Sequence, residues 1–586
     1  SSSFASGARP EQIRAAYAPY GAPPPPPNDG NDADTTAAAA PYFRATQTIA
    51  EFRDAWSHLE DGARETHSPG GGEIRVALAG RVLSKRVASK KLIFLDVESG
   101  GQRVQVMANE AHFLPANDAD ADVADADANN TTAITTEATP TGRFTAFRPC
   151  MHALQRGDII GVSGFPARSQ VGELSLVPRS LHFLTPCLHN IPAPGDSVLT
   201  DPNLRFRNRA KDLLSNPPSR ATLSARFRVI SSLRRFLEAH QFVEAETPIL
   251  SFSAGGAAAE SFVTRSKALG STADALHLRI APELYLKQLV VGGFDRVFEV
   301  GKVFRNEGID ATHNPEFTTC EFYAAYMEYE EMMELTEELL RHIEARVVLE
   351  REGAAAAGNG AAEEGGRDAT GEEDQRLIFG RPEDGHFARI SVYDELERIL
   401  GPNKLPPADE LSDSYAAKAL LDLCGKNPSL PSLPNGTPRS AEKILDHMIA
   451  HLIEPFCTGP TFLCDHPVVM SPLAKEHRNR PGLTERFELF VRGSELCNAY
   501  TELNDPKVQR ARFEQQRKVF DEYGDVESHG KDDTFCEALE YGLPPTAGWG
   551  IGVDRLVMLL TGHTHIREVL PFALMKFDRG SLNVSE

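Results

Sequence analysis

The chain has 586 residues, of which 41% are hydrophobic and 25% charged, the balance of a soluble globular protein with about two to four domains. No apolar run approaches the roughly 18–20 residues of a membrane-spanning helix, so we expect no membrane partner. The net charge is −22, but segments 115–142 and 350–376 carry −6 and −5 of it. The charge therefore does not rule out a nucleic-acid partner.

Eight cysteines are scattered along the chain, and none of them forms a CxxC pair. This spacing argues against a zinc ribbon, a thioredoxin-like motif and a secreted disulfide scaffold. Reduced thiols fit a cytoplasmic protein, with the mitochondrion or another organelle matrix as the alternative.

The first part of the chain combines a low-complexity arm with a β-rich domain. Residues 1–45 are rich in Ser, Ala and Pro and are expected to be a disordered N-terminal arm without a secretory signal. Within 46–186, runs of β-forming residues broken by glycine predict about five strands and suggest a small closed β-barrel of the OB type. The acidic segment 115–142 has no apolar face, so we interpret it as a solvated insertion in this barrel.

The second part of the chain predicts a larger domain of mixed helices and strands. Residues 187–220 are rich in Pro and Asn and are interpreted as a linker. In the α+β segment 221–577, apolar residues at helical spacing predict helices such as 221–241. The low-complexity segment 350–376 is a second insertion, and 578–586 form a tail.

Residues 297–326 predict a strand, a turn-rich loop and a second strand, which suggests an antiparallel hairpin. Arg305 and Glu307 are two positions apart, so they share one face of the first strand. One face of the second strand holds Phe317, Thr319, Glu321 and Tyr323. Such a polar face either serves a polar ligand or is a salt-bridged sheet surface, and spacing alone leaves both open.

A further predicted strand, SELCNAYTELN, repeats this pattern with Asn498, Tyr500 and Glu502 on one face. Upstream, in FELFV, Glu488 lies seven residues before Glu495. Two carboxylates at neighbouring antiparallel positions can hold a hard cation through oxygen ligands. A pair of surface acids is the alternative, and spacing does not decide between them.

The glycine-rich stretch AGWGIGVDR, residues 547–555, runs into an apolar helix. Its glycines allow a ligand to approach the backbone closely. The guanidinium of Arg555 can stack on a planar base and meet a phosphate. Taken alone, such a motif is more often structural than functional.

These stretches, together with FVEAETPIL and its Pro248, resemble the three motifs of class II aminoacyl-tRNA synthetases. Three segments of the sequence are similar to lysyl-tRNA synthetases in particular. They are RIAPELYLKQLVVGGFDRVFEVGKVFRNEGIDATHNPEFTTCEFY, CDHPVVMSPLAKEHR and EYGLPPTAGWGIG. The resemblance covers roughly residues 41–577, apart from the two insertions.

This resemblance implies an α+β fold, with a six-stranded antiparallel sheet in a catalytic domain behind an N-terminal OB-fold barrel. It implies ATP-dependent activation of L-lysine to lysyl-adenylate and transfer of lysine to tRNA(Lys), with Mg²⁺ on the nucleotide. It also implies a homodimer, whose contact is made by helix 221–241 and the strand ending at Pro248.

The resemblance also assigns residue roles in the catalytic domain. Arg305 and Arg555 are the implied catalytic residues, and Glu488 and Glu495 the implied magnesium ligands. The implied ATP site comprises Arg305, Glu307, His313, Asn314, Phe317, Glu488, Gly548 and Arg555. The implied lysine site comprises Gly256, Glu283, Glu321, Tyr323, Asn498, Tyr500 and Glu502.

In the barrel, the family position of Phe94 implies stacking on an anticodon base, with Arg86, Gln105 and Glu173 as readers of base edges. The alternative for Phe94 is a core residue of the apolar run LIFL.

The nearest alternative is an asparaginyl or aspartyl relative. It is disfavoured because an aspartate side chain needs a cation, whereas the implied pocket is acidic. An inactive paralogue acting as a binding or regulatory module is disfavoured by the intact set of Arg305, Glu488, Glu495 and Arg555.

Overall fold

The computed structural model describes residues 43–68, 71–114, 147–189, 191, 199–252, 255–257, 259–266, 275–356, 377–380, 385–412, 414–434, 437–523 and 532–575. The chain forms two compact units, one up to Thr200 and a larger one that takes in almost all of the chain from Asp201. The predicted insertion 115–142 and tail 578–586 lie outside the described residues, as do most of the predicted arm and of the insertion 350–376.

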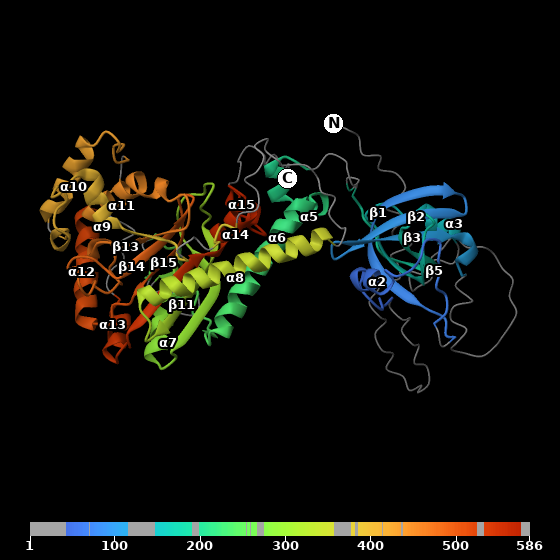
Figure 1. The fold of residues 1–586 in the computed structure, drawn as a ribbon, viewed down its shortest axis with the longest axis horizontal. Coiled ribbons are helices and arrows are strands. Elements are labelled where there is room, and N and C mark those ends of the chain that lie inside the picture. Colours follow the sequence, from blue (N-terminus) through green and yellow to red (C-terminus); the bar gives the residue numbers. More distant parts are fainter. Residues whose placement is uncertain are drawn as a thin grey trace. The chain divides into compact units, whose positions relative to one another are not determined.

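The smaller unit is a closed five-stranded barrel, as predicted for an OB fold (Figure 1). The strand order is β1-β2-β3-β5-β4. Alternate side chains such as Val82, Leu95 and Val106 fill its core. Helix α2 begins with a capping box between Thr48 and Glu51. The bounds are α2 Ile49–Ala55, β1 Val76–Ser89, β2 Leu92–Ser99, β3 Gln102–Asn109, α3 Phe147–Ala153, β4 Ile159–Arg168 and β5 Leu174–Thr185.

The larger unit is built on an eight-stranded sheet with the order β12-β13-β14-β15-β16-β11-β10-β6. Its six middle strands are antiparallel, as the resemblance implies, while β12 and β6 add parallel edges. The bounds are β6 Val243–Glu244, β10 Arg296–Phe304, β11 Glu316–Ala325, β12 Ala388–Ser391, β13 Thr461–Cys464, β14 Arg486–Val491, β15 Ser494–Thr501 and β16 Thr546–Gly552. A small second sheet joins β7 (Leu250–Ser251), β9 (Leu276–Leu278) and β8 (Val263–Thr264).

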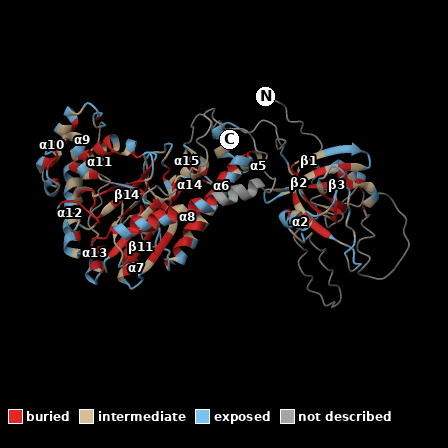
Figure 2. Cartoon of the chain, in the orientation of Figure 1, coloured by how far each residue is buried: buried red, intermediate tan, exposed pale blue. Residues whose placement is uncertain are grey.

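Three helices cover one face of the large sheet, namely α6 (Pro217–Ala239), α8 (Tyr329–Ala356) and α14 (Val553–Thr561). Apolar side chains on these helices and on the strands form one core, which appears as buried residues in Figure 2. Phe322 and Trp549 stack within it, with ring centroids 4.7 Å apart. Because strand side chains alternate between faces, Glu321 and Tyr323 point away from these helices. The opposite face of the sheet is therefore the polar one.

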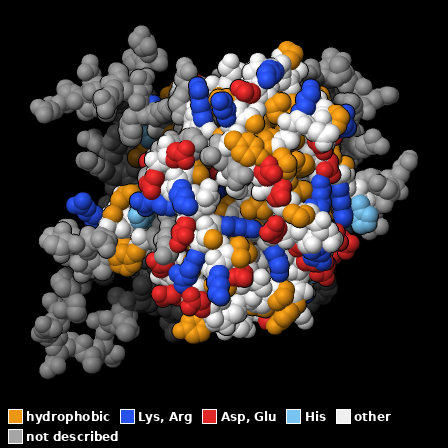
Figure 3. Space-filling model, turned by 90° about the vertical axis from the view of Figure 1, so that its left-hand side faces the viewer, with side chains coloured by type: hydrophobic (Ala, Val, Ile, Leu, Met, Phe, Trp, Pro, Cys, Tyr) orange, Lys and Arg blue, Asp and Glu red, His pale blue; other side chains and the backbone are white. Residues whose placement is uncertain are grey.

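Shorter helices complete the larger unit. Clusters of apolar residues pack α9, α10 and α11 together and pack α7 against α12 and α13. The bounds are α7 Glu283–Val291, α9 Val392–Leu400, α10 Ser414–Lys426, α11 Ala441–Leu452, α12 Pro506–Tyr523, α13 Asp533–Glu540 and α15 Ile566–Val569. Figure 3 shows a face on which acidic and basic side chains are interspersed.

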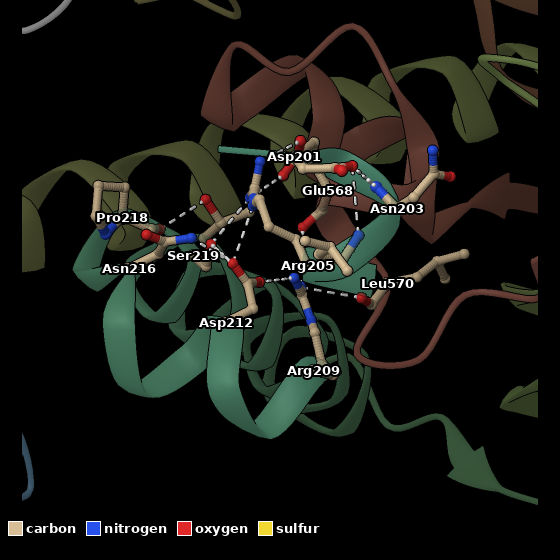
Figure 4. Close-up of polar contacts among 12 residues, drawn as sticks. Asp201, Asn203, Arg205, Arg209, Asp212, Asn216, Pro218, Ser219, Glu568 and Leu570 are labelled. Atoms are coloured by element: carbon tan, nitrogen blue, oxygen red, sulfur yellow. Dashed lines mark hydrogen bonds and ion pairs between the residues drawn. The ribbon is translucent and has the colours of Figure 1, made fainter. Parts of the chain in front are cut away.

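The predicted linker 187–220 differs from expectation in its second half. This second half forms α4 (Pro202–Arg207), α5 (Arg209–Ser215) and the start of α6, and it belongs to the larger unit. Arg205 donates to Asp212 at 2.9 Å and to Glu568 of α15 at 2.8 Å (Figure 4). Arg209 also bonds Asp212, which is fully buried. These partners are distant in sequence, so composition alone could not reveal the packing.

Candidate active site

A cavity of about 390 Å³ lies in the larger unit on the polar face of the sheet. It brings together residues from the loop between β10 and β11 and from β11, β14, β15, β16 and α14. Of the predicted ATP, lysine and magnesium residues, all but Glu502 line it: Gly256, Glu283, Arg305, Glu307, His313, Asn314, Phe317, Glu321, Tyr323, Glu488, Glu495, Asn498, Tyr500, Gly548 and Arg555.

The glycine strand β16 explains how side chains from two other strands meet over one cavity. Gly550 lies opposite Glu321 on one side and Asn498 on the other. Gly548 lies in the same way between Tyr323 and Tyr500. A Cβ atom at Gly548 would overlap the Tyr323 ring, so only glycine leaves this space open.

One end of the cavity presents arginines and an aromatic ring. The guanidinium of Arg305 lies 5.2 Å from the centroid of the Phe317 ring. The backbone N–H of Arg305 donates to the backbone carbonyl of Pro315 at 2.9 Å, which closes the loop between β10 and β11. Arg305 Nε is buried and has no hydrogen-bond partner among the described residues. A buried donor left unmatched in this way fits an anionic ligand.

Arg555 approaches the same end from the start of α14. Its guanidinium donates to the Glu495 carbonyl at 3.1 Å and lies 3.2 Å from His313 Nε2. His313 is held by Asp310, 2.9 Å from its Nδ1. Burial alone would raise the pKa of Asp310, but hydrogen bonds from Thr312 and His313 outweigh this effect and hold the pKa at about 2.

Glu307 and Asn314 lie in the same loop, but their environments differ. Glu307 is exposed, whereas Asn314 is buried. Asn314 Nδ2 donates to the Glu316 carbonyl at 2.6 Å, and Asn314 Oδ1 has no hydrogen-bond partner among the described residues. This unmatched acceptor is suited to an amino group such as that of adenine.

Two carboxylates lie beside the arginine end. Arg486 Nη2 donates to Glu488 at 2.6 Å, and His466 lies 3.3 Å from the same carboxylate. Burial opposes ionisation, but the charges of Arg486 and His466 outweigh it and hold the pKa of Glu488 at about 2. Burial and the charge of Glu488 raise the pKa of Glu495.

This pair of like charges fits a divalent cation. No group of three or more His, Cys, Asp or Glu in the described ranges could hold a metal by protein ligands alone. Two carboxylates are nevertheless a normal protein contribution to Mg²⁺, since phosphates and water complete its coordination. Glu488 and Glu495 therefore fit a Mg²⁺ ion that arrives with a nucleotide.

The opposite end of the cavity is acidic and aromatic. Tyr500 donates to Glu283 Oε1 at 2.6 Å, and Tyr323 donates to Glu321 Oε2 at 3.3 Å. Burial and the charge of Glu283 raise the pKa of Glu321 to about 8. Gly256 has a φ of +89°, and a Cβ there would lie 3.1 Å from the Cβ of Glu283. Glycine at this position therefore keeps the acidic end open.

Glu502 is not among the residues that line the cavity, but its carboxylate lies beside Gly548, which does. It is 1% exposed and pairs with Lys287 of α7, which also donates to Glu283 at 2.6 Å. Lys287 was not predicted as a site residue, although it follows Glu283 by one helical turn in a largely apolar helix. Arg486, which shares a strand face with Glu488 and bonds Asn498 at 3.1 Å, was not predicted either.

The predicted anticodon residues lie on the barrel. Phe94 is half-buried and alternates with the core residues Ile93 and Leu95, and Arg86 lies 5.7 Å from its ring centroid. Glu173 is exposed. Gln105 is 9% exposed and accepts a hydrogen bond from Ser175 at 3.1 Å, so it is the least accessible of the four.

Residues 201–576 match the model of a protein family described as tRNA synthetases class II (D, K and N). The matched range is more than half of the chain and contains the whole cavity.

The chain belongs to the class II tRNA synthetases.

Individual relatives place this synthetase in the lysine group. It is 39% identical over 542 residues to lysine–tRNA ligase cla4 of Cladosporium cladosporioides, which covers 92% of this chain and 81% of the relative. It is 42% identical over 514 residues to a probable cytoplasmic lysine–tRNA ligase of Encephalitozoon cuniculi, covering 86% and 88%. It is 40% identical over 511 residues to a mitochondrial lysine–tRNA ligase of Schizosaccharomyces pombe, covering 86% and 85%.

Proposed function

We propose that this synthetase activates L-lysine with ATP and transfers the lysyl group to tRNA(Lys). The observation that carries the proposal is that one cavity is lined both by Arg305 and Arg555 and by Glu283 and Glu321. Arg305 and Arg555 suit the polyphosphate, and Glu283 and Glu321 suit the two ammonium groups of lysine. An aspartyl enzyme would need a cation where this cavity presents acids.

Activation is a displacement at phosphorus. An oxygen of the lysine carboxylate forms a bond to the α-phosphorus, and the bond from that phosphorus to the bridging oxygen of pyrophosphate breaks. A carboxylate with a pKa of about 3.5 is already ionised near neutral pH, so no general base is needed. Catalysis then consists of positioning the two substrates and stabilising developing negative charge, which Arg305 and Arg555 do.

Transfer completes the reaction. A hydroxyl of the terminal adenosine of tRNA attacks the lysyl carbonyl carbon, and the bond from that carbon to the phosphate oxygen breaks to release AMP. The hydroxyl proton is released to solvent. When bound, Mg²⁺ neutralises charge on the phosphates. Glu488 and Glu495 would hold it, and Arg486 keeps Glu488 ionised for that role.

Glu321 is expected to make lysine use depend on pH. With its pKa raised to about 8, the carboxyl group carries a proton in the empty pocket at lower pH. The substrate α-ammonium needs the carboxylate, so kcat/KM for lysine should rise as the pH rises from about 6 to about 8. Initial rates of ATP–pyrophosphate exchange across this range test the prediction. Glu321→Gln should remove the rise, and a flat wild-type profile would contradict it.

We assign the barrel to anticodon binding, because single-stranded bases are recognised by aromatic stacking beside charged side chains. Phe94 and Arg86 offer that combination on the outside of β2 and β1.

We infer a homodimer from apolar surface on the larger unit. Helix α6 packs beside β6, and large apolar side chains remain exposed on α6 and residues 243–252, at Phe227, Val243, Leu250 and Phe252. A second copy covering them would bury surface that a monomer rarely exposes. Light scattering should then give about twice the chain mass of 64.0 kDa.

The compartment is a separate question. Among the described residues, no helix has the length and apolar character that a membrane crossing requires. Relatives named as cytoplasmic and as mitochondrial both match this chain. We propose the cytoplasm, and fluorescence microscopy of the tagged full-length protein distinguishes it from an organelle matrix.

Aminoacylation of transcribed tRNA tests the function directly. We expect charging of tRNA(Lys) with lysine and none of tRNA(Asp) or tRNA(Asn) with aspartate or asparagine. Charging of either of those pairs would favour the aspartyl or asparaginyl alternative instead.

A further inference from the structure

Lys287 is a buried cation beside a pocket built for another cation. It lies on α7 with none of its side chain exposed. Its ammonium group donates to Glu283 Oε1 at 2.6 Å and pairs with Glu502. The rings of Tyr500 and Phe535 lie 5.7 and 5.5 Å from the same nitrogen. Two carboxylates and two aromatic faces therefore enclose one ammonium group.

Charges alternate along a buried series beside the cavity. Lys287 lies between the carboxylates of Glu502 and Glu283, and Glu283 is the member of the series that lines the cavity. Glu502 Oε1 has no hydrogen-bond partner among the described residues, so Lys287 is the group that compensates this carboxylate. A substrate ammonium on the cavity side of Glu283 would be the next positive charge in this alternating series.

Glu283 is held from two sides at one atom. Lys287 and Tyr500 both donate to Oε1 of its carboxylate, each at 2.6 Å. The acidic side chain that faces the cavity therefore has a fixed depth, because its rotation is blocked by two donors from different elements, α7 and β15. Without Lys287, the buried charges of Glu283 and Glu502 would repel each other and Glu283 would lose one of its anchors.

We propose that Lys287 is a specificity-determining positioning residue, which fixes Glu283 at the depth reached by the distal ammonium of L-lysine. This inference rests on the proposed lysine substrate. A fixed carboxylate rejects a shorter diamino acid such as L-ornithine, whose ammonium falls one methylene short and leaves the buried charge without a partner.

The test compares L-lysine and L-ornithine in ATP–pyrophosphate exchange by the full chain. Lys287→Met keeps the side-chain size but removes the charge. We expect the ratio of kcat/KM for lysine to kcat/KM for ornithine to fall by about tenfold or more. This lies within the range of discrimination that one methylene group provides. KM for lysine should rise more than KM for ATP.

Arg341→Met is the matched control. Arg341 pairs with Glu337 at 2.9 Å in the same i, i+4 arrangement on α8 and does not line the cavity. Losing this pair should lower the melting temperature and leave the lysine-to-ornithine ratio unchanged. An unchanged ratio in folded Lys287→Met would overturn the inference, whereas wild-type protein inactive with lysine would overturn the proposed function instead.

A double variant covers the case in which Lys287→Met does not fold. Combining Lys287→Met with Glu502→Gln removes both the Lys287 ammonium and the Glu502 carboxylate, so no unpaired charge is left on residue 502. Glu283 still lacks one anchor, so we expect a folded protein with the relaxed ratio. Wild-type selectivity in this double variant would mean that Lys287 only neutralises Glu502, and the proposal would fail.

Discussion

Replacing Arg305 by Ala should lower kcat for lysyl-adenylate formation on the order of 10²–10³-fold. Arg305 lines the cationic end of the cavity, and its Nε lacks a partner among the described residues. The attraction between that donor and an anionic ligand is strongest in the transition state, where negative charge builds around the α-phosphorus. Single-turnover measurement of adenylate formation isolates this step from product release.

Two further variants sharpen the Arg305 prediction. Arg305→Lys keeps the charge but loses the planar fork of donors, so it should restore only part of the rate. Arg398→Ala removes an exposed arginine that pairs with Glu395 on α9, and its rate should equal that of the wild type. An Arg305→Ala variant that changes KM for ATP and leaves kcat intact would show that Arg305 only binds the nucleotide.

Glu502→Gln should weaken lysine binding by more than ~2 kcal/mol and leave ATP binding nearly intact. Glu502 is buried and is one of the two carboxylates that compensate Lys287. Removing the Glu502 charge leaves Lys287 paired with one carboxylate, that of Glu283, which lines the cavity. Calorimetric titration with lysine and separately with ATP measures the two affinities.

Glu344→Gln is the matched control for Glu502. Glu344 is a buried carboxylate on α8 that accepts from the Ile378 and Phe379 amides at 2.7 and 3.0 Å, away from the cavity. Its loss should affect stability and leave lysine binding unchanged. If Glu502→Gln weakens lysine and ATP equally, the assignment of the acidic end to lysine is wrong.

Local sequence pattern indicated the polar strand faces of the candidate site, and the family resemblance assigned their roles. On β11 and β15, polar residues at every second position predicted one polar face, and Glu321, Tyr323, Asn498 and Tyr500 do share it. A period of two is a property of the strand itself, so it needs no knowledge of distant partners. The glycines of β16 were found for a similar reason, because close approach to a backbone requires glycine.

Features that depend on distant partners were missed or placed differently. Lys287 and Glu502 are 215 positions apart and meet only because the fold brings α7 next to the residue that follows β15. In the same way, α4 and α5 are ordered through Arg205 and Glu568, which lie far apart in the chain. The parallel edge strands β6 and β12 are short and carry no pattern that marks them.

The central claim is that a cavity lined by both acidic and cationic side chains selects a dicationic amino acid for reaction with ATP. ATP–pyrophosphate exchange with the twenty amino acids, one at a time, tests it most directly. We expect exchange with L-lysine far above that with every other amino acid. Preferred exchange with aspartate, asparagine or any neutral amino acid would contradict it.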